Sequence, residues 1–325
     1  MSPPATSGSA RTRRGRWARG LGPLFVLGAL YFWWRAVEAS TTRADLRSTL
    51  AIARGHEGWL LAALAAAALY LLCQAVVWRR ILADMTLRLP WPMALRAWSV
   101  SNLGRYLPGG VWHLVGRVEL GRGQGVAWTS GTVGIVLEQG LQLVAALALV
   151  AMSLPFWPPE SVVRQYAWLA ALVPLGLALL HPRVFYPVVD RLLARLRQPP
   201  LAVRPSYGRL LGYLGGYAIG HLCNGSAFAC AAIALGAPLA MLPAMIGGAL
   251  FAWTVGFVIV VAPGGLGPRE AAVTAALAPY IGADVAALAA ALWRVANVLS
   301  EVAVAGAAEA LARRFRRVAA GDGSR

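Results

Sequence analysis

Long apolar runs constrain this chain more than any other feature. Six runs reach the length of about 17 to 25 residues that a helix needs to cross a bilayer. They lie near residues 20–37, 58–78, 128–154, 166–182, 209–235 and 285–309. Hydrophobic residues make up 58% of the 325, and charged residues only 13%. This balance excludes an ordinary soluble domain and predicts an all-α polytopic membrane protein.

A Pro-Gly-Gly motif interrupts two further apolar segments, near residues 91–121 and 241–282. The two copies are Pro108-Gly109-Gly110 and Pro263-Gly264-Gly265. Proline removes a backbone donor and glycine withdraws steric support for a helix, so the freed backbone groups need protein or water around them. We therefore expect six full spans and two re-entrant hairpins. Eight full spans are the alternative that the sequence leaves open.

The distribution of arginine predicts the topology. All thirty basic residues are arginines, and twenty-three of them fall on the cytoplasmic side if the N-terminus is inside. Six crossings then return the C-terminus to the cytoplasm, and the two hairpins enter from opposite sides as an inverted repeat. The predicted organisation is a basic cytoplasmic tail (1–19), one membrane domain (20–312) and a second basic cytoplasmic tail (313–325). The repeats cover about 58–182 and 209–312.

The remaining composition excludes several classes of function. The net charge of +17 is explained by topology and anionic lipid headgroups, and no soluble basic patch predicts nucleic-acid binding. The three cysteines lie in apolar stretches without the spacing of a disulfide framework or metal site. No nucleotide-binding motif is present, so we expect no cofactor and no metal. Residues 183–208 are expected to form only a basic loop.

Tryptophans near the ends of the predicted spans are expected to form an interfacial belt. They are Trp59, Trp78, Trp128, Trp157 and Trp168.

Three charged residues lie well inside predicted spans, away from the span ends. An ionised group facing lipid costs roughly 2.5 to 3.5 kcal/mol on insertion scales, so Glu138, Arg294 and Glu301 should face the protein interior or a hydrated cavity. Helical spacing places Glu138 with Gln142 on one face and Arg294 with Glu301 on another. Our hypothesis is that Glu138 and Arg294 approach each other across a pseudo-twofold axis. A structural ion pair and a role in gating or proton coupling both remain open.

Four charged residues flank the two breaks: Arg105, Arg117, Arg269 and Glu270. Half-helix ends and guanidinium groups could together hold a phosphate. The alternative is that these arginines anchor the hairpin ends at the interface. His113 and His221 are either proton relays or packing residues. The predicted substrate-binding set is Arg105, Arg117, Glu138, Arg269, Glu270, Arg294 and Glu301, and no catalytic residue is predicted.

Two stretches carry a resemblance to a known family. The segment 104–142 contains the first Pro-Gly-Gly motif, Gly125-Val126 and Glu138-Gln139, and the second motif continues through Arg269-Glu270 to Trp293-Arg294. Both resemble the flippase-like membrane domain of lysylphosphatidylglycerol synthases and their stand-alone relatives. Trp112-His113 and Pro268 depart from the family pattern.

The resemblance implies movement of an anionic phospholipid or polyprenyl-linked glycolipid between leaflets of the bacterial inner membrane. It implies membrane lipids as partners, with envelope-biosynthesis enzymes as further candidates. The aminoacyl transferase part of the two-domain synthases has no counterpart in this sequence, so we expect a transporter rather than an enzyme.

Two other classes remain open: an integral-membrane glycosyltransferase and a non-catalytic membrane scaffold. The thirteen acidic residues are scattered, which argues against the acidic cluster that such an enzyme needs. The lipid, the direction, the energy coupling and any homo-oligomeric state are open at this stage.

Overall fold

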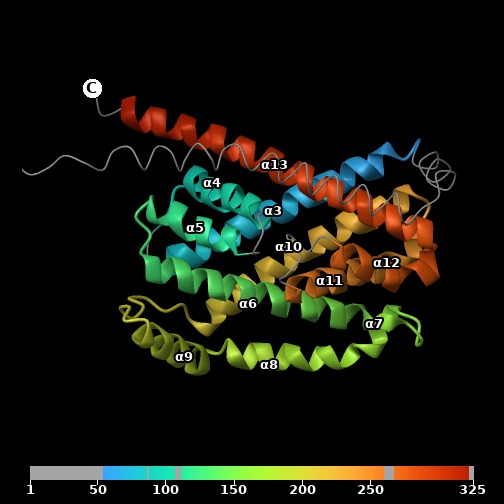
Figure 1. The fold of residues 1–325 in the computed structure, drawn as a ribbon, viewed down its shortest axis with the longest axis horizontal. Helices are drawn as coiled ribbons and strands as arrows, with labels where there is room; N and C mark the ends of the chain where they lie inside the picture. Colours follow the sequence, from blue (N-terminus) through green and yellow to red (C-terminus); the bar gives the residue numbers. More distant parts are fainter. Residues whose placement is uncertain (1–53, 86–87, 107–110, 260–266, 322–325) are drawn as a thin grey trace, which may run out of the picture.

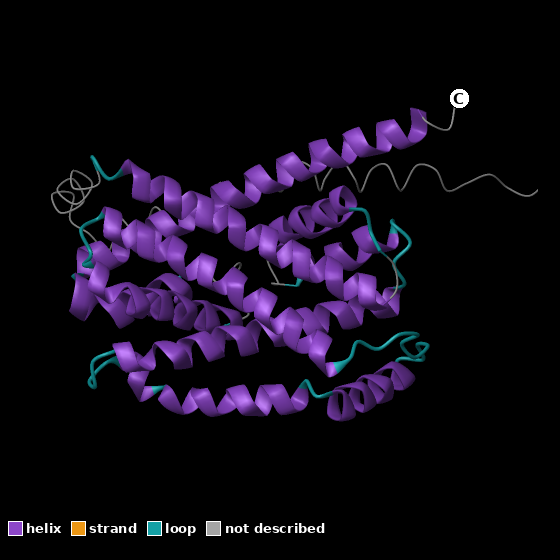
Figure 2. Cartoon of the chain, turned by 180° about the vertical axis from the view of Figure 1, so that it is seen from behind, coloured by secondary structure: helices purple, strands orange, loops and turns teal. Residues whose placement is uncertain are grey.

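The computed structural model describes residues 54–85, 88–106, 111–259 and 267–321. Within these ranges every regular element is a helix, and the long helices run side by side (Figures 1 and 2). The predicted all-α fold is therefore confirmed. Both Pro-Gly-Gly motifs and the predicted span 20–37 lie outside the described residues.

The helices fall into two similar series separated by a third group. The first series is α3 (Glu57–Met85), α4 (Trp91–Asn102), η1 (Leu103–Tyr106), α5 (Trp112–Arg122) and α6 (Trp128–Ser153). The middle group is η2 (Leu154–Phe156), α7 (Val162–Gln165), η3 (Ala167–Ala171), α8 (Leu172–Leu179) and α9 (Pro182–Arg195). The second series is α10 (Tyr207–Ala234), η4 (Leu239–Met241), α11 (Leu242–Val258), α12 (Pro268–Ile281) and α13 (Ala283–Gly321).

Corresponding glycines separate the last two helices of each series. Gly125 lies between α5 and α6 with φ of 90°, and Gly282 lies between α12 and α13 with φ of 88°. Side chains with a Cβ rarely adopt this left-handed conformation, so glycine allows the chain to turn sharply from the short helix into the long one.

The two series exchange packing partners. The opening helices α3 and α10 pack against each other, α4 packs against α13, and α11 packs against α6. Each series thus places its short second helix against the long last helix of the other. In Figure 1, α4 and α5 lie toward one end of the molecule and α11 and α12 toward the other.

Among the described residues, five helical stretches are long and apolar enough to cross a membrane. They are Glu57–Met85, Trp128–Phe156, Tyr207–Ala234, Leu239–Val258 and Ala283–Val318. Four of them coincide with predicted spans. The exception is Leu239–Val258, which contains α11 and corresponds to the first arm of the predicted second hairpin. The predicted span 166–182 is shorter than expected, and a sixth span results only if it is joined to α9 across a bend of 74°. The re-entrant hairpins remain a prediction.

The sequence-based expectation of a loop at 183–208 is wrong in its first part, which forms α9. Pro182 occupies the first turn of this helix, where a missing backbone donor costs nothing. A proline disfavours helical geometry at the residue that precedes it. This explains why α8 ends at Leu179, shortly before Pro182. At the other end of the chain, α13 continues through the basic residues after 312 as far as Gly321.

The predicted tryptophan belt is also partly wrong. Trp78 and Trp157 are each only 2% exposed and belong to the protein core. Trp59, Trp128 and Trp168 are exposed, as a belt requires. A position near the end of an apolar run does not decide which way its side chain points, because the helix face depends on neighbouring helices.

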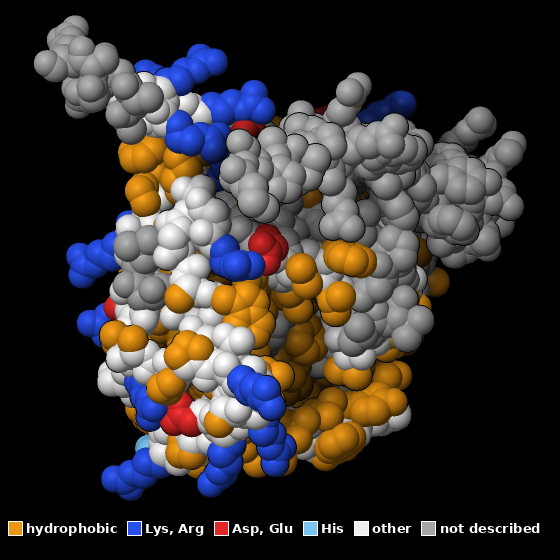
Figure 3. Space-filling model, turned by 60° about the vertical axis from the view of Figure 1, so that its left-hand side comes forward, with side chains coloured by type: hydrophobic (Ala, Val, Ile, Leu, Met, Phe, Trp, Pro, Cys, Tyr) orange, Lys and Arg blue, Asp and Glu red, His pale blue; other side chains and the backbone are white. Residues whose placement is uncertain are grey.

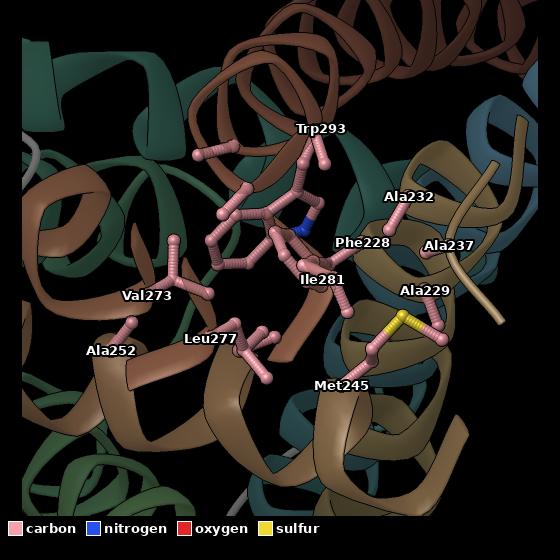
Figure 4. Packing of buried hydrophobic residues seen from close by; sticks show 14 of the residues in the cluster. Phe228, Ala229, Ala232, Ala237, Met245, Ala252, Val273, Leu277, Ile281 and Trp293 are labelled. Carbon is pink, nitrogen blue, oxygen red and sulfur yellow. The ribbon is translucent and has the colours of Figure 1, made fainter. Parts of the chain in front are cut away.

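The largest apolar cluster joins the helices of the second series (Figure 4). Phe228 of α10 and Trp293 of α13 meet edge to face, with ring centroids 5.7 Å apart. Val273 and Leu277 of α12 are fully buried in the same cluster. This packing fixes the start of α12 relative to α13 and so positions the charged residues on both helices.

Candidate functional site

A cavity of about 290 Å³, lined by both polar and apolar side chains, lies between helices of the two series. Its wall combines charged and amide side chains with aromatic rings, contributed by α3, α4, η1, α5, α6, α11 and α12. The polar lining residues are Asn102, Arg105, His113, Arg117, Glu138, Gln139, Gln142 and Arg269, and the aromatic ones are Tyr70, Trp98, Trp253 and Phe257.

A buried ion pair forms one wall of the cavity. The Arg117 guanidinium on α5 lies 2.5 Å from the Glu138 carboxylate on α6, and the two side chains are only 2% and 1% exposed. The charges compensate each other where water has little access, which removes most of the cost of placing either inside a membrane protein.

Neighbouring side chains hold this pair in one geometry. The indole nitrogen of Trp98 donates to Glu138 Oε1 at 3.1 Å, and the Gln142 amide donates to the same oxygen at 3.3 Å. The Arg117 guanidinium lies over the Trp98 ring, 4.8 Å from its centroid, and its Nε donates to Ser101 Oγ at 3.2 Å. The pair is therefore a fixed part of the cavity wall, with helix α4 supplying much of its support.

A second carboxylate crosses between the two series. Glu301 of α13 is 3% exposed and accepts hydrogen bonds from Arg105 Nη1 at 3.1 Å and from the Tyr106 hydroxyl at 2.7 Å. Arg105 also donates to Asn102 Oδ1 at 2.5 Å. These contacts attach η1, the element just before the first Pro-Gly-Gly motif, to the last helix of the second series.

The second series repeats the first ion pair with its signs exchanged. Arg294 Nε on α13 lies 3.8 Å from Glu270 Oε1 on α12, and Glu270 Oε2 accepts from the backbone nitrogen of Gly267 at 2.8 Å. In the first series the short helix after the break carries the arginine, whereas in the second it carries the glutamate. The Arg294 guanidinium also lies 5.5 Å from the centroid of the Tyr106 ring.

Arg269 differs from the other arginines of the site. It lines the cavity and its guanidinium lies 6.0 Å from the centroid of the Trp293 ring. Among the described residues no carboxylate oxygen lies within 4.0 Å of it, and its buried Nε has no hydrogen-bond partner. Arg269 thus leaves a positive charge facing the cavity that the described carboxylates do not compensate directly.

The structure brings the seven predicted site residues into one region but gives them different positions. Four of them line the cavity: Arg105, Arg117, Glu138 and Arg269. The other three, Glu270, Arg294 and Glu301, lie behind the lining and bond to it or to elements beside it.

The expected direct pairing of Glu138 with Arg294 is wrong. Each residue instead pairs with the short helix of its own series, because that helix packs directly against the long one. Of the two histidines, His113 lines the cavity. His221 is fully buried between the rings of Tyr70 and Trp253, with centroids at 6.0 Å and 4.5 Å, which fits a packing residue.

Sequence reasoning missed the aromatic side of the site. Trp98 and Tyr106 bond directly to the buried carboxylates, and Trp253 stacks on Phe257 with centroids 5.2 Å apart in the cavity wall. A signal was present for Trp98, because it lies at helical spacing from Asn102 and Arg105 on the segment leading to the first break. No comparable polar pattern marked Trp253 and Phe257.

The chain matches the model of a known protein family. No curated protein sequence matches the chain significantly. The family model described as the lysylphosphatidylglycerol synthase TM region matches residues 21–305, which covers most of the chain and both halves of the site. The protein therefore belongs to the family of lysylphosphatidylglycerol synthase transmembrane regions.

Proposed function

We propose that the protein moves an anionic lipid headgroup from one leaflet to the other through the polar cavity, while the acyl chains stay in the bilayer. The candidate substrates are anionic phospholipids and polyprenyl-linked glycolipids of the bacterial inner membrane. Membership of a family of phospholipid-handling membrane regions supports this proposal. The observation that carries it is the cavity-facing charge of Arg269.

The charge balance of the site favours an anion. Four arginines and three glutamates make up the set, and three arginines have a carboxylate within 4.0 Å: Arg105, Arg117 and Arg294. One phosphate monoanion beside Arg269 would complete the pairing. A guanidinium group binds phosphate through parallel N–H donors, and the low local dielectric strengthens this attraction.

The repeated architecture supports a transport cycle. Transporters built from inverted repeats place their substrate between broken helices and expose it alternately to each side. Here the breaks follow η1 and α11, and the cavity lies between elements of both series. The proposed movement is a rocking of α4 and α5 against α11 and α12. The contacts of Glu301 with Arg105 and Tyr106 would hold one end state.

Reconstitution into liposomes tests the proposal. Fluorescent anionic, zwitterionic and polyprenyl-linked lipids would be supplied, and their appearance in the outer leaflet would be followed by dithionite quenching. We expect the wild type to accelerate exchange of an anionic lipid. Arg269→Gln should slow this exchange at least tenfold, while Arg269→Lys keeps part of it.

Arg122→Gln provides a matched control, because Arg122 is 53% exposed and pairs with Glu119 on the surface. It should exchange lipid at the wild-type rate. If folded wild-type protein moves none of the lipid classes, the proposal fails, and a scaffold or an enzyme becomes the better explanation. Incubation with a polyprenyl-phosphate sugar donor and analysis of the products would separate these two.

A further inference from the structure

Helix α9 (Pro182–Arg195) carries an apolar surface that the protein does not cover. Its inner face, made by Tyr186, Val189 and Leu193, packs against the bundle. Beside it runs an exposed stripe at helical spacing, formed by Val184, Val188, Leu192 and Leu196, whose side chains are 41% to 54% exposed. An apolar stripe of this kind needs an apolar environment of its own.

Exposed arginines accompany this apolar stripe on α9. Arg183, Arg191 and Arg195 are exposed, and among the described residues no carboxylate oxygen lies within 4.0 Å of them. The one acidic residue of the helix, Asp190, is instead paired with Arg204 at 2.9 Å. The exposed charge of α9 is therefore positive throughout and open to a ligand from outside the protein.

The path of the chain changes direction at α9. The stretch 167–179 and helix α9 are bent by 74° from each other, so α9 turns away from the direction of the apolar helix before it. A hydrogen bond from the Tyr186 hydroxyl to the Pro205 carbonyl oxygen, at 2.6 Å, holds its inner face in place. Figure 3 shows arginine side chains beside exposed hydrophobic ones on the lower part of this side of the molecule.

We propose that α9 is an interfacial helix whose exposed stripe enters the acyl region of the adjacent leaflet and whose arginines bind anionic phospholipid headgroups. A basic amphipathic helix lying in the membrane plane has this composition. This site is separate from the cavity, and it binds lipid without transporting it. It makes the lipid around α9 richer in anionic species than the bulk membrane.

Fluorescence quenching in liposomes tests this binding directly. A fluorophore is attached through Val188→Cys in a chain whose Cys73, Cys223 and Cys230 are replaced by alanine. The full chain is placed in vesicles that contain spin-labelled phosphatidylglycerol or spin-labelled phosphatidylcholine. We expect strong quenching at position 188, stronger with phosphatidylglycerol. A fluorophore at Ala194→Cys, about 120° around the helix from position 188, should be quenched much less.

The charge dependence identifies the arginines as the binding groups. Each arginine near a membrane surface contributes about a fivefold preference for anionic lipid. Arg191→Gln combined with Arg195→Gln should therefore lower the ratio of the two quenching constants several-fold, and by at most about 25-fold. The matched control is Arg314→Gln with Arg317→Gln, which removes two exposed charges from α13 and should leave the ratio unchanged.

Two results would overturn the proposal. Equal quenching by the two lipids would mean that α9 lies in lipid without recognising charge. Absence of quenching at position 188 would mean that solvent or a second copy of the chain covers the stripe, and cross-linking at Val188→Cys would identify the second copy. Neither result depends on lipid transport, so failure here and failure of the proposed function are distinguishable.

Discussion

The ion pair between Arg117 and Glu138 allows a quantitative test of the site. Glu138→Gln keeps the size of the side chain and an oxygen that can accept from Trp98, so the main loss is the negative charge. Both side chains are at most 2% exposed, and the substitution would leave the Arg117 guanidinium buried without its counter-charge. Breaking a buried pair in this way costs about 3 to 5 kcal/mol.

The free energy of unfolding would be measured by titrating mixed micelles with a denaturing detergent and following tryptophan fluorescence. Arg117→Gln should cost a similar amount, because it leaves the carboxylate unpaired. The double variant removes both charges and keeps neutral hydrogen-bonding groups, so it should be more stable than either single variant. The resulting coupling energy should be about 2 kcal/mol or more.

Glu119→Gln is the matched control, because Glu119 lies on α5 two residues from Arg117. Glu119 pairs with Arg122 at 3.0 Å, but the two side chains are 59% and 53% exposed. An exposed pair contributes about 0 to 1 kcal/mol because water solvates both charges. A loss below about 1 kcal/mol for Glu138→Gln would refute the reasoning, since it would mean that cavity water solvates Arg117 as well as bulk water does.

Three further substitutions test the site and its packing. Gly256→Ala would place a Cβ 3.1 Å from Arg269 Nε, and the displaced guanidinium should slow anionic-lipid exchange in liposomes without a large loss of stability. Tyr106→Phe removes the 2.7 Å hydrogen bond to Glu301 and should cost about 1.5 to 3 kcal/mol of unfolding free energy, measured in mixed micelles. Gly225→Ala would place a Cβ 2.7 Å from a side-chain carbon of Ile246. The resulting overpacking between α10 and α11 should lower stability by about 1 to 3 kcal/mol, seen as a lower thermal unfolding midpoint.

Hydropathy and charge predicted the features that depend on the local sequence alone, namely the membrane-spanning helices and the burial of charged side chains. The spans at α3, α6, α10 and α13 follow from apolar length alone, because a bilayer sets that length. Gly125 and Gly282 both adopt a left-handed geometry that favours glycine. Burial of Glu138, Arg294 and Glu301 followed from the cost of placing a charge in lipid.

The sequence could not predict contacts that depend on which helices are neighbours. Glu138 was expected to meet Arg294, but the packing of α5 on α6 places Arg117 beside it instead. Helix α9 was missed because residues 183–208 were interpreted as a basic loop, whereas Pro182 lies in a first turn, where proline is tolerated. Trp78 was assigned to the interface from its position in the chain, and only the packing of α3 shows that it faces inward.

Within the described part of the site, the charges pair so that one arginine is left without a carboxylate partner. In each series an arginine and a glutamate join the short helix after the break to the long helix that follows, so each half is close to neutral and can be stable inside a membrane. Arg105 and Glu301 join the halves, again with balanced charge. Arg269 is left over, next to Glu270 in sequence but facing the cavity. Since every other site arginine is matched within the protein, a ligand can be attracted by one charge without disrupting the pairs that hold the helices. A cavity built in this way would favour an anion that is held weakly enough to leave on the other side.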